Sequence, residues 1–369
     1  MSKPNRATPE GTAAYRDRFQ GMVAQGHFRK LGELTVGSIG MGTYLGLHDD
    51  AIDAGYENAL TEALRFACNH IDTAINYRCM RSEKAIGRAL SRLFAEGAVS
   101  REEVFLSTKG GYIPFDGEPP PNIRGFIRSA YLEPGIVDED DLVGGCHAMT
   151  PRFLEKQITR SLENLRVETI DLYYLHNPEV HRAVLPKPHF LDRVRRAFAF
   201  LEEEVERGRI GLYGVSSWEA FRAEPSSPVY ISLEDLAQAA KEAAGDGHHF
   251  AAIQLPFNAA MMEGYALVAQ EVGDEYLSAI DAAAHLGLGV TASAPLLQGR
   301  LLKRFPGFLD KGMRDLRSKS EKAIQFARSV PGIASVLVGM SRDMHVIENL
   351  SLARRPPLTE EELLRMFEE

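Results

Sequence analysis

Four side chains that can hold or transfer a proton close or follow apolar runs in three short segments of the chain: Asp72 and Tyr77 in residues 71–77, Lys109 in 106–109 and His176 in 172–176. A tyrosine hydroxyl can donate a proton to a carbonyl oxygen, but its unperturbed pKa near ~10 makes it a weak acid alone. A neighbouring ammonium favours the tyrosinate and lowers that pKa. We therefore expect Lys109 to lower the pKa of Tyr77, while Asp72 fixes Lys109 and balances its charge. His176 would share the proton relay and orient the carbonyl oxygen.

Carbonyl reduction also needs a hydride, which no side chain supplies at a useful rate, so a nicotinamide is the expected donor. Taken singly, each residue has a plain structural explanation. Tyr77 fits a packed position at a helix start, Lys109 a solvated strand end, and His176 a cap on a strand. All of them lie at or just past strand ends that should share one face of the fold, and this favours the catalytic interpretation.

The rest of the chain alternates strand-like and helix-like segments. A hairpin that turns at Gly32 is expected over residues 28–38. Strands are expected at 39–44, 69–73, 104–108, 170–175, 211–215, 250–255, 289–293 and 334–338. Helices are expected at 53–68, 82–94, from 150, 191–206, 232–244, 275–286, 319–330, 342–352 and 359–368.

This alternation predicts an α/β fold, a (β/α)8 TIM barrel with an N-terminal β-hairpin. A doubly wound open sheet alternates in the same way, but no Gly-x-Gly-x-x-Gly motif opens a helix after the first strand. Residues 1–26 are polar and are interpreted as an N-terminal extension, and residues 27–369 as a single barrel domain.

One segment, residues 112–149, is a long insertion after the third strand of the barrel. Loops of this length in a compact domain are usually functional or disordered. Because it leaves from the carboxyl end of a strand, we expect it to fold over the barrel mouth and help to form the substrate pocket. Its apolar side chains for that purpose are Phe115, Phe126, Ile127 and Tyr131.

Composition excludes several classes of protein. The net charge of −9 argues against nonspecific binding to nucleic acid or acidic membranes. No apolar run reaches the ~18 residues of a membrane span, and no secretory signal is expected. The three cysteines, Cys68, Cys79 and Cys146, show no metal spacing, so a reduced cytoplasmic protein is expected.

Two other features are interpreted as structural. His248 and His249 are adjacent, and neighbouring residues on a strand point to opposite faces, so no metal site is predicted. Arg193, Arg195 and Arg196 are interpreted as a solvated helix face.

The motifs together resemble the aldo-keto reductase superfamily over roughly residues 28–355. The resemblance is carried by the segments 72–77, 82–87, 107–109, 170–176, 208–216, 254–258, 294–301 and 348–350. It implies a (β/α)8 barrel without a metal that uses NADPH or less often NADH. It also implies that Tyr77 is the proton donor and that Asp72, Lys109 and His176 support it.

The same resemblance implies a set of cofactor-binding positions along the carboxyl ends of the strands. They are Gly42, Thr43, Tyr44, Asp72, Ser216, Ser217, Gln254, Ser293, Leu296, Gly299, Gly339, Ser341, Arg342, Glu348 and Asn349. Ser216 and Gln254 would hold the carboxamide, Leu296 and Gly299 would lie along the pyrophosphate, and the positions from Gly339 onward would reach the adenosine. Barrels commonly bind phosphates near strands seven and eight, which agrees with this arrangement.

The chain departs from the family pattern at four places. Ser217 stands where Asn is frequent, and Ser293 stands where an aromatic ring often stacks on the nicotinamide, a role that Trp218 is a candidate to take. The loop 78–81 makes the spacing after Tyr77 two residues longer than usual, and His345 replaces a frequent Arg.

NADPH is expected to bind more tightly than NADH. Ser341 and Arg342 can contact a 2′-phosphate, and Arg342 can grip it through two donors at once. No acidic residue occurs at positions 339–342 to favour a free ribose hydroxyl, although Asp343 is close.

The leading hypothesis is therefore an NAD(P)H-dependent oxidoreductase that reduces an aldehyde or ketone, or oxidises an alcohol or sugar hydroxyl in reverse. Its partners would be small carbonyl or sugar substrates, and its oligomeric state stays open. One alternative is a nucleotide-binding barrel that acts as a redox sensor or regulatory subunit with little turnover. Another is an unrelated barrel isomerase or lyase with Lys109 as a Schiff base, which would leave Tyr77 and His176 without a role.

Overall fold

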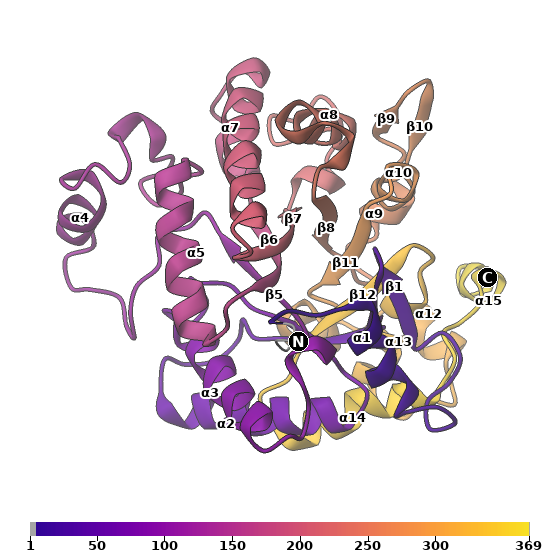
Figure 1. The fold of residues 1–369 in the computed structure, drawn as a ribbon. Coiled ribbons are helices and arrows are strands. Elements are labelled where there is room, and N and C mark those ends of the chain that lie inside the picture. Colours follow the sequence, from indigo (N-terminus) through magenta and orange to yellow (C-terminus); the bar gives the residue numbers. More distant parts are fainter. Residues whose placement is uncertain (1–4, 369) are drawn as a thin grey trace.

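A computed structural model describes residues 5–368 as a closed barrel of parallel strands surrounded by helices (Figure 1). Within those residues, the barrel strands are β3 (Ile39–Gly42), β4 (His70–Asp72), β5 (Phe105–Gly110), β6 (Ile170–His176), β7 (Ile210–Ser216), β8 (Phe250–Pro256), β11 (Gly289–Ser293) and β12 (Ile333–Gly339). They pair in the order β11-β12-β3-β4-β5-β6-β7-β8, and this confirms the predicted TIM barrel.

Helices cover the outside of the barrel: α2 (Asp50–Arg65), α3 (Arg81–Ala95), α5 (Pro151–Leu165), α7 (Lys187–Glu206), α8 (Leu233–Ala244), α10 (Ala279–His285), α13 (Lys319–Ser329) and α14 (Asp343–Ser351). Their inner faces carry the buried side chains of the largest apolar cluster, such as Leu90 on α3 and Ile158 on α5. Because all barrel strands run parallel, their carboxyl ends meet at one face of the molecule.

An antiparallel hairpin closes the opposite end of the barrel. It consists of β1 (Phe28–Leu31) and β2 (Leu34–Gly37), as the sequence predicts, and it contacts β11 and β12. Leu31 and Val36 of the hairpin share a buried cluster with Leu172 and Ala252 from inside the barrel. The amino-terminal end is therefore filled with apolar side chains, and the open end is the one where the strands finish.

The amino-terminal segment contains a helix, α1 (Pro9–Asp17), where the sequence indicated no regular element. Thr8 caps this helix by accepting a hydrogen bond from the backbone of Gly11 at 2.9 Å, and Pro9 occupies its first turn. The hydroxyl of Tyr15 donates to the carbonyl of Leu64 at 2.6 Å, which ties α1 to the end of α2. Residues 1–4 of the predicted extension lie outside the described residues, as does residue 369.

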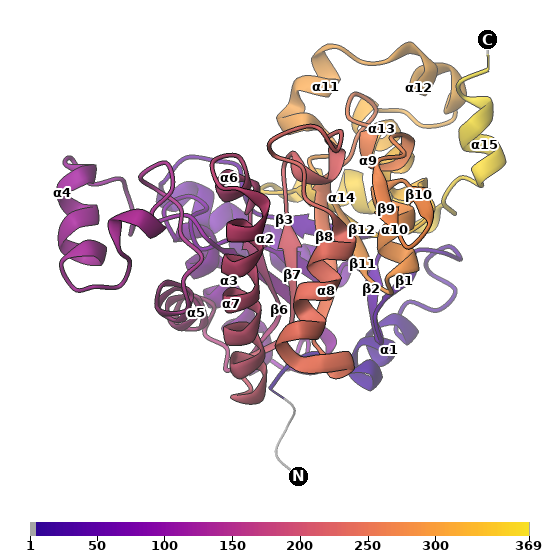
Figure 2. The ribbon, with the colours of Figure 1, turned by 90° about the horizontal axis from the view of Figure 1, so that it is seen from above.

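The insertion is folded, but it does not cover the barrel mouth as predicted. It holds the short helix α4 (Ile123–Ile127) and a π-helical turn, and both lie at the edge of the molecule beyond α5 in two views (Figures 1 and 2). Ile127 and Tyr131 pack with Phe153 of α5 in a separate apolar cluster. The apolar side chains expected to line the pocket instead attach the insertion to the outside of α5.

A second insertion lies before α10, where the sequence predicted a helix from residue 275. Residues Glu275–Leu277 form strand β10, which pairs with β9 (Gln270–Val272), and the helix begins only at Ala279. Ser278 caps it by accepting a hydrogen bond from the backbone of Asp281 at 3.2 Å. Further short helices are α6 (Glu179–Arg182), α9 (Glu263–Ala266), α11 (Arg300–Lys303), α12 (Gly307–Gly312) and α15 (Glu360–Arg365).

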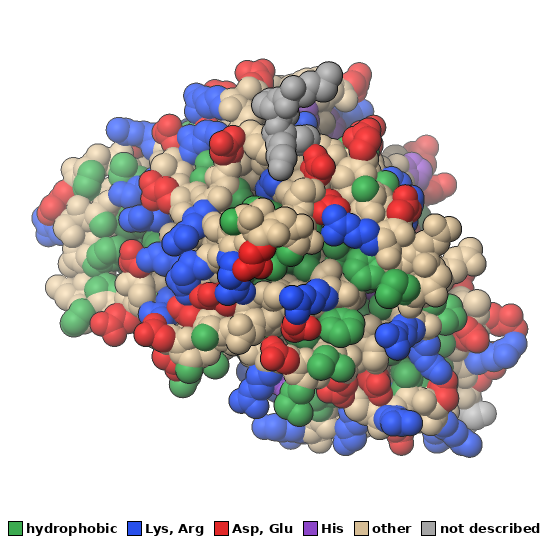
Figure 3. Space-filling view, turned by 60° about the horizontal axis from the view of Figure 1, so that its bottom comes forward, with side chains coloured by type: hydrophobic (Ala, Val, Ile, Leu, Met, Phe, Trp, Pro, Cys, Tyr) green, Lys and Arg blue, Asp and Glu red, His purple; other side chains and the backbone are tan. Residues whose placement is uncertain are grey.

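Acidic and basic side chains are interspersed on the face shown in Figure 3, which displays no field of a single sign. Among the described helices, none combines the length and the apolar character that crossing a bilayer requires.

Candidate active site

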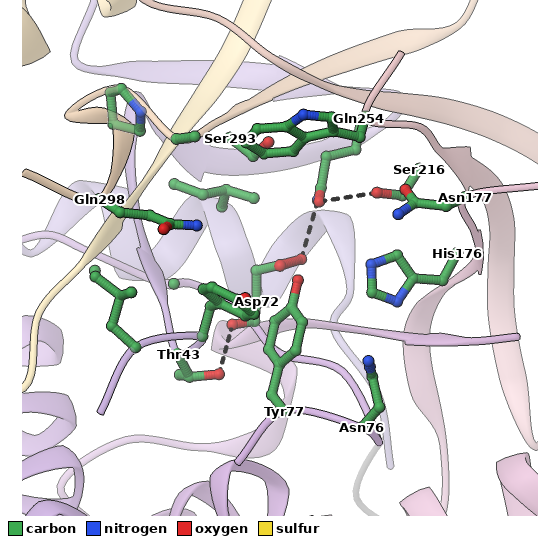
Figure 4. Close-up of a pocket in the computed structure, with 18 of the residues that line it drawn as sticks. Thr43, Asp72, Asn76, Tyr77, His176, Asn177, Ser216, Gln254, Ser293 and Gln298 are labelled. Carbon is green, nitrogen blue, oxygen red and sulfur yellow. Dashed lines mark hydrogen bonds between the residues drawn. The ribbon is translucent and has the colours of Figure 1, made fainter. Parts of the chain in front are cut away.

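A cavity of about 450 Å³ opens at the carboxyl ends of the barrel strands (Figure 4). Its volume is within the range of sites for small ligands, ~300–1,000 Å³. Among the described residues, its lining consists of Gly42, Thr43, Tyr44, Leu45, Asp72, Asn76, Tyr77, Tyr112, His176, Asn177, Ser216, Ser217, Trp218, Gln254, Ser293, Ala294, Pro295, Leu296, Gln298, Gly299, Leu337 and Gly339. Three of the four predicted proton-relay residues are in this lining, and Lys109 lies buried directly behind it.

Asp72 and Lys109 form a fully buried ion pair at the ends of β4 and β5. The Lys109 ammonium donates to both carboxylate oxygens of Asp72 and to the carbonyl of Thr73 at 2.8 Å, so all of its protons have acceptors. Ser107 donates a further hydrogen bond to Asp72 at 3.0 Å. Burial lowers the pKa of Lys109 below its ordinary value, and the charge of Asp72 opposes that shift.

The backbone after β4 carries Tyr77 to the cavity. It is held along β5 by hydrogen bonds from Thr73 to the carbonyl of Ser107 at 3.0 Å and from Ile75 to the carbonyl of Lys109 at 3.2 Å. The longer spacing noted in the sequence then produces three successive left-handed residues, with φ values of 49°, 54° and 64° at positions 78–80. Such residues cost ~1–2 kcal/mol each when they are not glycine.

Arg78 holds this strained turn in place. Its side chain is 1% exposed, and its guanidinium donates to Asp53 at 2.6 Å and twice to the carbonyl of Leu47, at 2.9 and 2.7 Å. The two additional residues beside the proposed proton donor therefore form a defined turn with a buried anchor, and they do not loosen the loop.

Tyr77 packs between aromatic rings at the cavity wall. Its ring centroid is 5.0 Å from that of Tyr44 and 5.8 Å from that of His176, in edge-to-face arrangements, and the Lys109 nitrogen lies 5.0 Å from the Tyr77 centroid. Burial and the charge of Asp72 raise the pKa of Tyr77 well above its ordinary value. The pKa of Tyr77 is therefore raised and not lowered as the sequence led us to expect, because burial is the largest cause and the charge of Asp72 acts in the same direction. Tyr77 holds its proton at neutral pH.

His176 ends β6 and faces the same space as the Tyr77 hydroxyl (Figure 4). Burial, together with the positive charge of Lys109, lowers the pKa of His176 well below its ordinary value. The imidazole is therefore neutral at physiological pH, and it can donate a hydrogen bond through one nitrogen without being an acid. This agrees with an orienting role for a carbonyl oxygen and leaves Tyr77 as the stronger candidate for the proton donor.

The residues predicted for a carboxamide lie across the cavity from Tyr77. Gln254 donates to Asp72 at 3.1 Å and accepts from Ser216 at 3.2 Å (Figure 4). A primary amide has two donor hydrogens and two acceptor positions, so capacity for a second amide remains. Ser217, in place of the family's Asn, accepts a hydrogen bond from the backbone of Ala220 at 2.8 Å.

Ser293 lines the cavity at the end of β11, and because serine has no aromatic ring it offers no surface for stacking. Trp218 lines the same cavity and is 37% exposed, so an aromatic surface is available from the loop after β7. Beyond Ser293, the turn from Leu296 to Gly299 borders the cavity, with a left-handed φ of 80° at Gly299.

Of the positions predicted for the adenosine end, Gly339 lines the cavity, whereas Ser341, Arg342, Glu348 and Asn349 are not part of its lining. Ser341 is partly exposed, and Arg342 is exposed at the N-cap of α14. Glu348 and Asn349 follow on α14, and the side chain of Asn349 is buried. The structure therefore places Ser341 and Arg342 just before α14, close in sequence to Gly339 at the cavity edge, and Glu348 and Asn349 in the second half of that helix.

Several lining residues were missed by sequence reasoning. Asn76 and Asn177 are the immediate neighbours of Tyr77 and His176. Their place beside predicted residues at strand ends was the available signal. Tyr112 was not singled out, although it begins the insertion that was expected to help form the pocket, and it lines the cavity just past the end of β5. For Gln298 the sequence offered no such signal. Glu179 was also missed: it accepts from the backbone of Trp218 at 2.8 Å and fixes the loop after β7.

Comparison with known proteins places these features in context. The model of the aldo/keto reductase family matches residues 38–319. An uncharacterized oxidoreductase, YqkF of Bacillus subtilis, is 23% identical over 355 residues, which cover 91% of this chain and 94% of that protein. The aldo-keto reductase yakc [NADP(+)] of Schizosaccharomyces pombe is 28% identical over 207 residues, or 55% of this chain and 48% of that protein.

Among solved structures, an aldo/keto reductase from Klebsiella pneumoniae in complex with NADP and acetate is similar, with a TM-score of 0.62. It is 19% identical, and the match covers 93% of this chain and 94% of that one. At this identity the likeness supports the barrel fold.

Proposed function

The chain belongs to the aldo/keto reductase family, whose members reduce carbonyl compounds with NAD(P)H, and we propose that Tyr77 is its proton donor. In this proposal His176 orients the carbonyl oxygen, and the pair of Lys109 and Asp72 sets the electrostatics behind Tyr77.

The observation that carries this proposal is the convergence of Tyr77 and His176 on one cavity over a buried ion pair. The Tyr77 hydroxyl keeps its proton because burial raises its pKa, and the neutral His176 cannot serve as an imidazolium acid. Among these groups, Tyr77 is therefore the one that can release a proton to an oxygen bound between them. Positioned general acids of this kind typically contribute ~10²–10⁴-fold to the rate.

A nicotinamide cofactor supplies the hydride when it is bound. The residues present fit such a cofactor, since Ser216 and the amide of Gln254 offer matching partners for a carboxamide at the cavity wall. The turn up to Gly299 and the strand end at Gly339 present backbone along the way to α14. We propose that this chain binds NADPH in preference to NADH, with Ser341 and Arg342 near the 2′-phosphate. Two relatives whose names carry NADP support the choice.

The substrate in this proposal is a small aldehyde, ketone or sugar. The cavity offers hydroxyl, amide and aromatic groups beside Tyr77, including Tyr112, Asn177 and Trp218. These groups provide hydrogen-bond partners and an aromatic surface for a neutral polar molecule.

Two measurements on the purified protein test the proposal. Fluorescence titration with NADPH and NADH gives the cofactor affinities, and oxidation of NADPH is then followed with a panel of aldehydes, ketones and sugars. We expect tight NADPH binding and turnover of at least one carbonyl class. Tight binding without turnover on any carbonyl would favour the alternative function, a nucleotide-binding sensor. Absence of binding to both cofactors would contradict the proposal.

A further inference from the structure

A series of hydrogen bonds connects helix α7 to the active-site residue His176 in a chain through two other histidines. Arg193 of α7 contacts Nδ1 of His181 at 3.0 Å. Nε2 of His181 lies 3.0 Å from Nδ1 of His147, and Nε2 of His147 lies 2.6 Å from the backbone oxygen of His176. His147 and His181 are both fully buried. His147 belongs to the insertion, so this chain joins the insertion to the active site.

The chemistry of its two ends fixes every donor and acceptor in the chain. The carbonyl of His176 can only accept, so Nε2 of His147 must carry a hydrogen. A guanidinium can only donate, so Nδ1 of His181 must be unprotonated. The bond between the two imidazoles then has one consistent arrangement, in which Nε2–H of His181 donates to Nδ1 of His147. Both histidines are neutral with the hydrogen on Nε2.

The electrostatics agree with this assignment. Burial is the main cause that lowers the pKa of His147 to about 4 and that of His181 to about 3. Arg193 also donates to the carbonyl of Asp140 at 2.7 Å and pairs with Asp141 at 3.5 Å. The earlier interpretation of Arg193 as part of a solvated helix face is therefore wrong, because its side chain is 21% exposed and anchors both the histidine chain and the insertion.

Backbone pairing at the base of the insertion brings His147 to this position. The two ends of the insertion pair through a bridge between Tyr112 and His147 and a hydrogen bond from Ala148 to the carbonyl of Gly111 at 2.9 Å. Gly111 has φ 145°, and a Cβ there would lie 2.5 Å from Nε2 of His147 and 3.0 Å from the oxygen of His176. Only glycine leaves room for the His147–His176 bond.

His147 also supports the cavity wall through an aromatic contact. The ring of Tyr112 lies edge-to-face with His147 at 4.8 Å and with His176 at 5.3 Å, and Tyr112 lines the cavity. One imidazole from the insertion thus contacts both the backbone of His176 and the ring that packs on its side chain.

We propose that His147 is a positioning residue that holds His176 and Tyr112 at the cavity through this fixed chain, which Arg193 anchors. The role given to His176 rests on the proposed function, whereas the hydrogen-bond chain does not. The insertion thereby supports the active site through the contacts of His147 with the His176 backbone and the Tyr112 ring, and it does not cover the barrel mouth.

The hydrogens assigned to His147 and His181 can be measured without turnover, by NMR of the full-length protein labelled with ¹⁵N in its histidines. The signals of His147 and His181 are assigned with His147→Gln and His181→Gln variants. We expect the neutral Nε2–H form for both residues at pH 7, with no titration of either down to pH 5. An Nδ1–H form of either residue, or an imidazolium at pH 7, would contradict the proposed hydrogen bonds from Arg193 through His181 and His147 to His176.

Three variants test the positioning role by steady-state kinetics and cofactor titration. His147→Leu removes both hydrogen bonds, whereas His147→Gln keeps an amide that donates to the His176 carbonyl and accepts from His181. Arg196→Gln is the matched control, because Arg196 lies on the same helix and pairs with Asp192 at the surface. Small displacements of catalytic groups cost up to ~10²-fold, so we expect His147→Leu to lower kcat by ~10–10²-fold. The Kd for NADPH should hardly change.

His147→Gln should retain most of kcat, and Arg196→Gln should equal the parent. Equal losses in His147→Leu and His147→Gln, or an unchanged kcat in His147→Leu, would overturn the positioning role. If the parent turns over no carbonyl, the proposed function fails, and the ¹⁵N signals of His176 decide instead. They should move in His147→Leu and stay in His147→Gln. If His147→Leu does not fold, Arg193→Gln takes its place in both measurements, since it removes the anchor of the chain.

Discussion

The catalytic end and the adenosine end of the proposed binding site differ in the burial of their side chains and in the elements that carry them. At the catalytic end, Asp72 and Lys109 are fully buried and each has several hydrogen-bond partners. At the adenosine end, Arg342 is exposed and Ser341 partly so at the start of α14. The catalytic groups come from strand ends and an anchored turn, whereas the adenosine groups come from the segment before α14 and from α14 itself.

This difference follows from what each end must do. Groups that stabilise a transition state work best when their positions and dipoles are set before the substrate arrives. Groups that grip a phosphate can order on binding at a modest entropic cost. We therefore expect substitutions at the catalytic end to affect turnover far more than binding, and substitutions at the adenosine end to affect binding alone.

The largest effect is expected for Tyr77→Phe, which keeps the ring contacts with Tyr44 and His176 and removes only the transferable proton. Turnover should fall by ~10²–10⁴-fold while NADPH affinity stays close to that of the parent. Tyr276→Phe, at an exposed position on β10, is the matched control. Steady-state rates and fluorescence titration measure the two effects. Turnover near the parent value would rule out Tyr77 as the proton donor.

Lys109→Met should be nearly as damaging, because it leaves the buried Asp72 carboxylate without its counter-charge. Breaking a buried pair in this way typically costs ~3–5 kcal/mol of stability, so thermal unfolding should shift together with the loss of turnover. Lys156→Met, an exposed lysine on α5, controls for the substitution itself. A variant with parental stability and turnover would show that the pair is dispensable.

Lowering the pH should reduce the free energy of unfolding, first through the buried histidines and only at lower pH through protonation of carboxylates. The pKa of His27 and that of His70 are both lowered to about 4 by burial. Between pH ~6.5 and ~4 the unfolded chain binds protons that the folded chain excludes, so stability is complete above pH ~6.5 and falls as the pH falls. One such group contributes at most ~3 kcal/mol at 1.36 kcal/mol per pKa unit.

Urea unfolding at several pH values between 7 and 4.5 measures this loss. His27→Asn should flatten part of the dependence, while His345→Asn, at the adenosine end on α14, should leave it as in the parent. A free energy of unfolding that is constant over this range would show that the buried histidines are solvated or already charged.

The smallest effect is expected at the adenosine end. Arg342→Ala should weaken NADPH binding by ~1.5–3 kcal/mol, the range for hydrogen bonds to charged groups, with kcat and NADH affinity nearly unchanged. Arg365→Ala on α15 serves as the exposed control. Equal losses for the two cofactors would contradict a phosphate contact, and a change in kcat would contradict the division between the two ends.

The sequence predicted that Asp72, Tyr77 and His176 meet at one face of the barrel, because that convergence depends on short-range patterns. An apolar run that stops at Asp72 or His176 places that residue at the carboxyl end of a parallel strand, and a closed barrel brings those ends together. The sign of the Tyr77 pKa shift was beyond the sequence, since it depends on how burial and the Asp72 charge balance the ammonium.

Other features were hidden because they depend on contacts across long separations. His147, His181 and Arg193 come from the insertion, α6 and α7, and no spacing relates them. The apolar residues of the insertion were expected to line the substrate pocket, but they pack with one another and with α5, because the sequence does not say which surface they contact. The start of α10 had a local signal that was missed, namely Ser278 as a cap.

The pH dependence of the single-turnover reduction rate tests the central assignment most directly. With saturating NADPH and a carbonyl substrate from the panel, the rate is measured from pH 5 to 9 in the parent. Since Tyr77 keeps its proton and His176 stays neutral over this range, we predict a rate with no inflection near pH ~6.5, the ordinary pKa of histidine. A rate that falls as the pH rises through ~6.5 would identify an imidazolium as the proton donor and contradict the account.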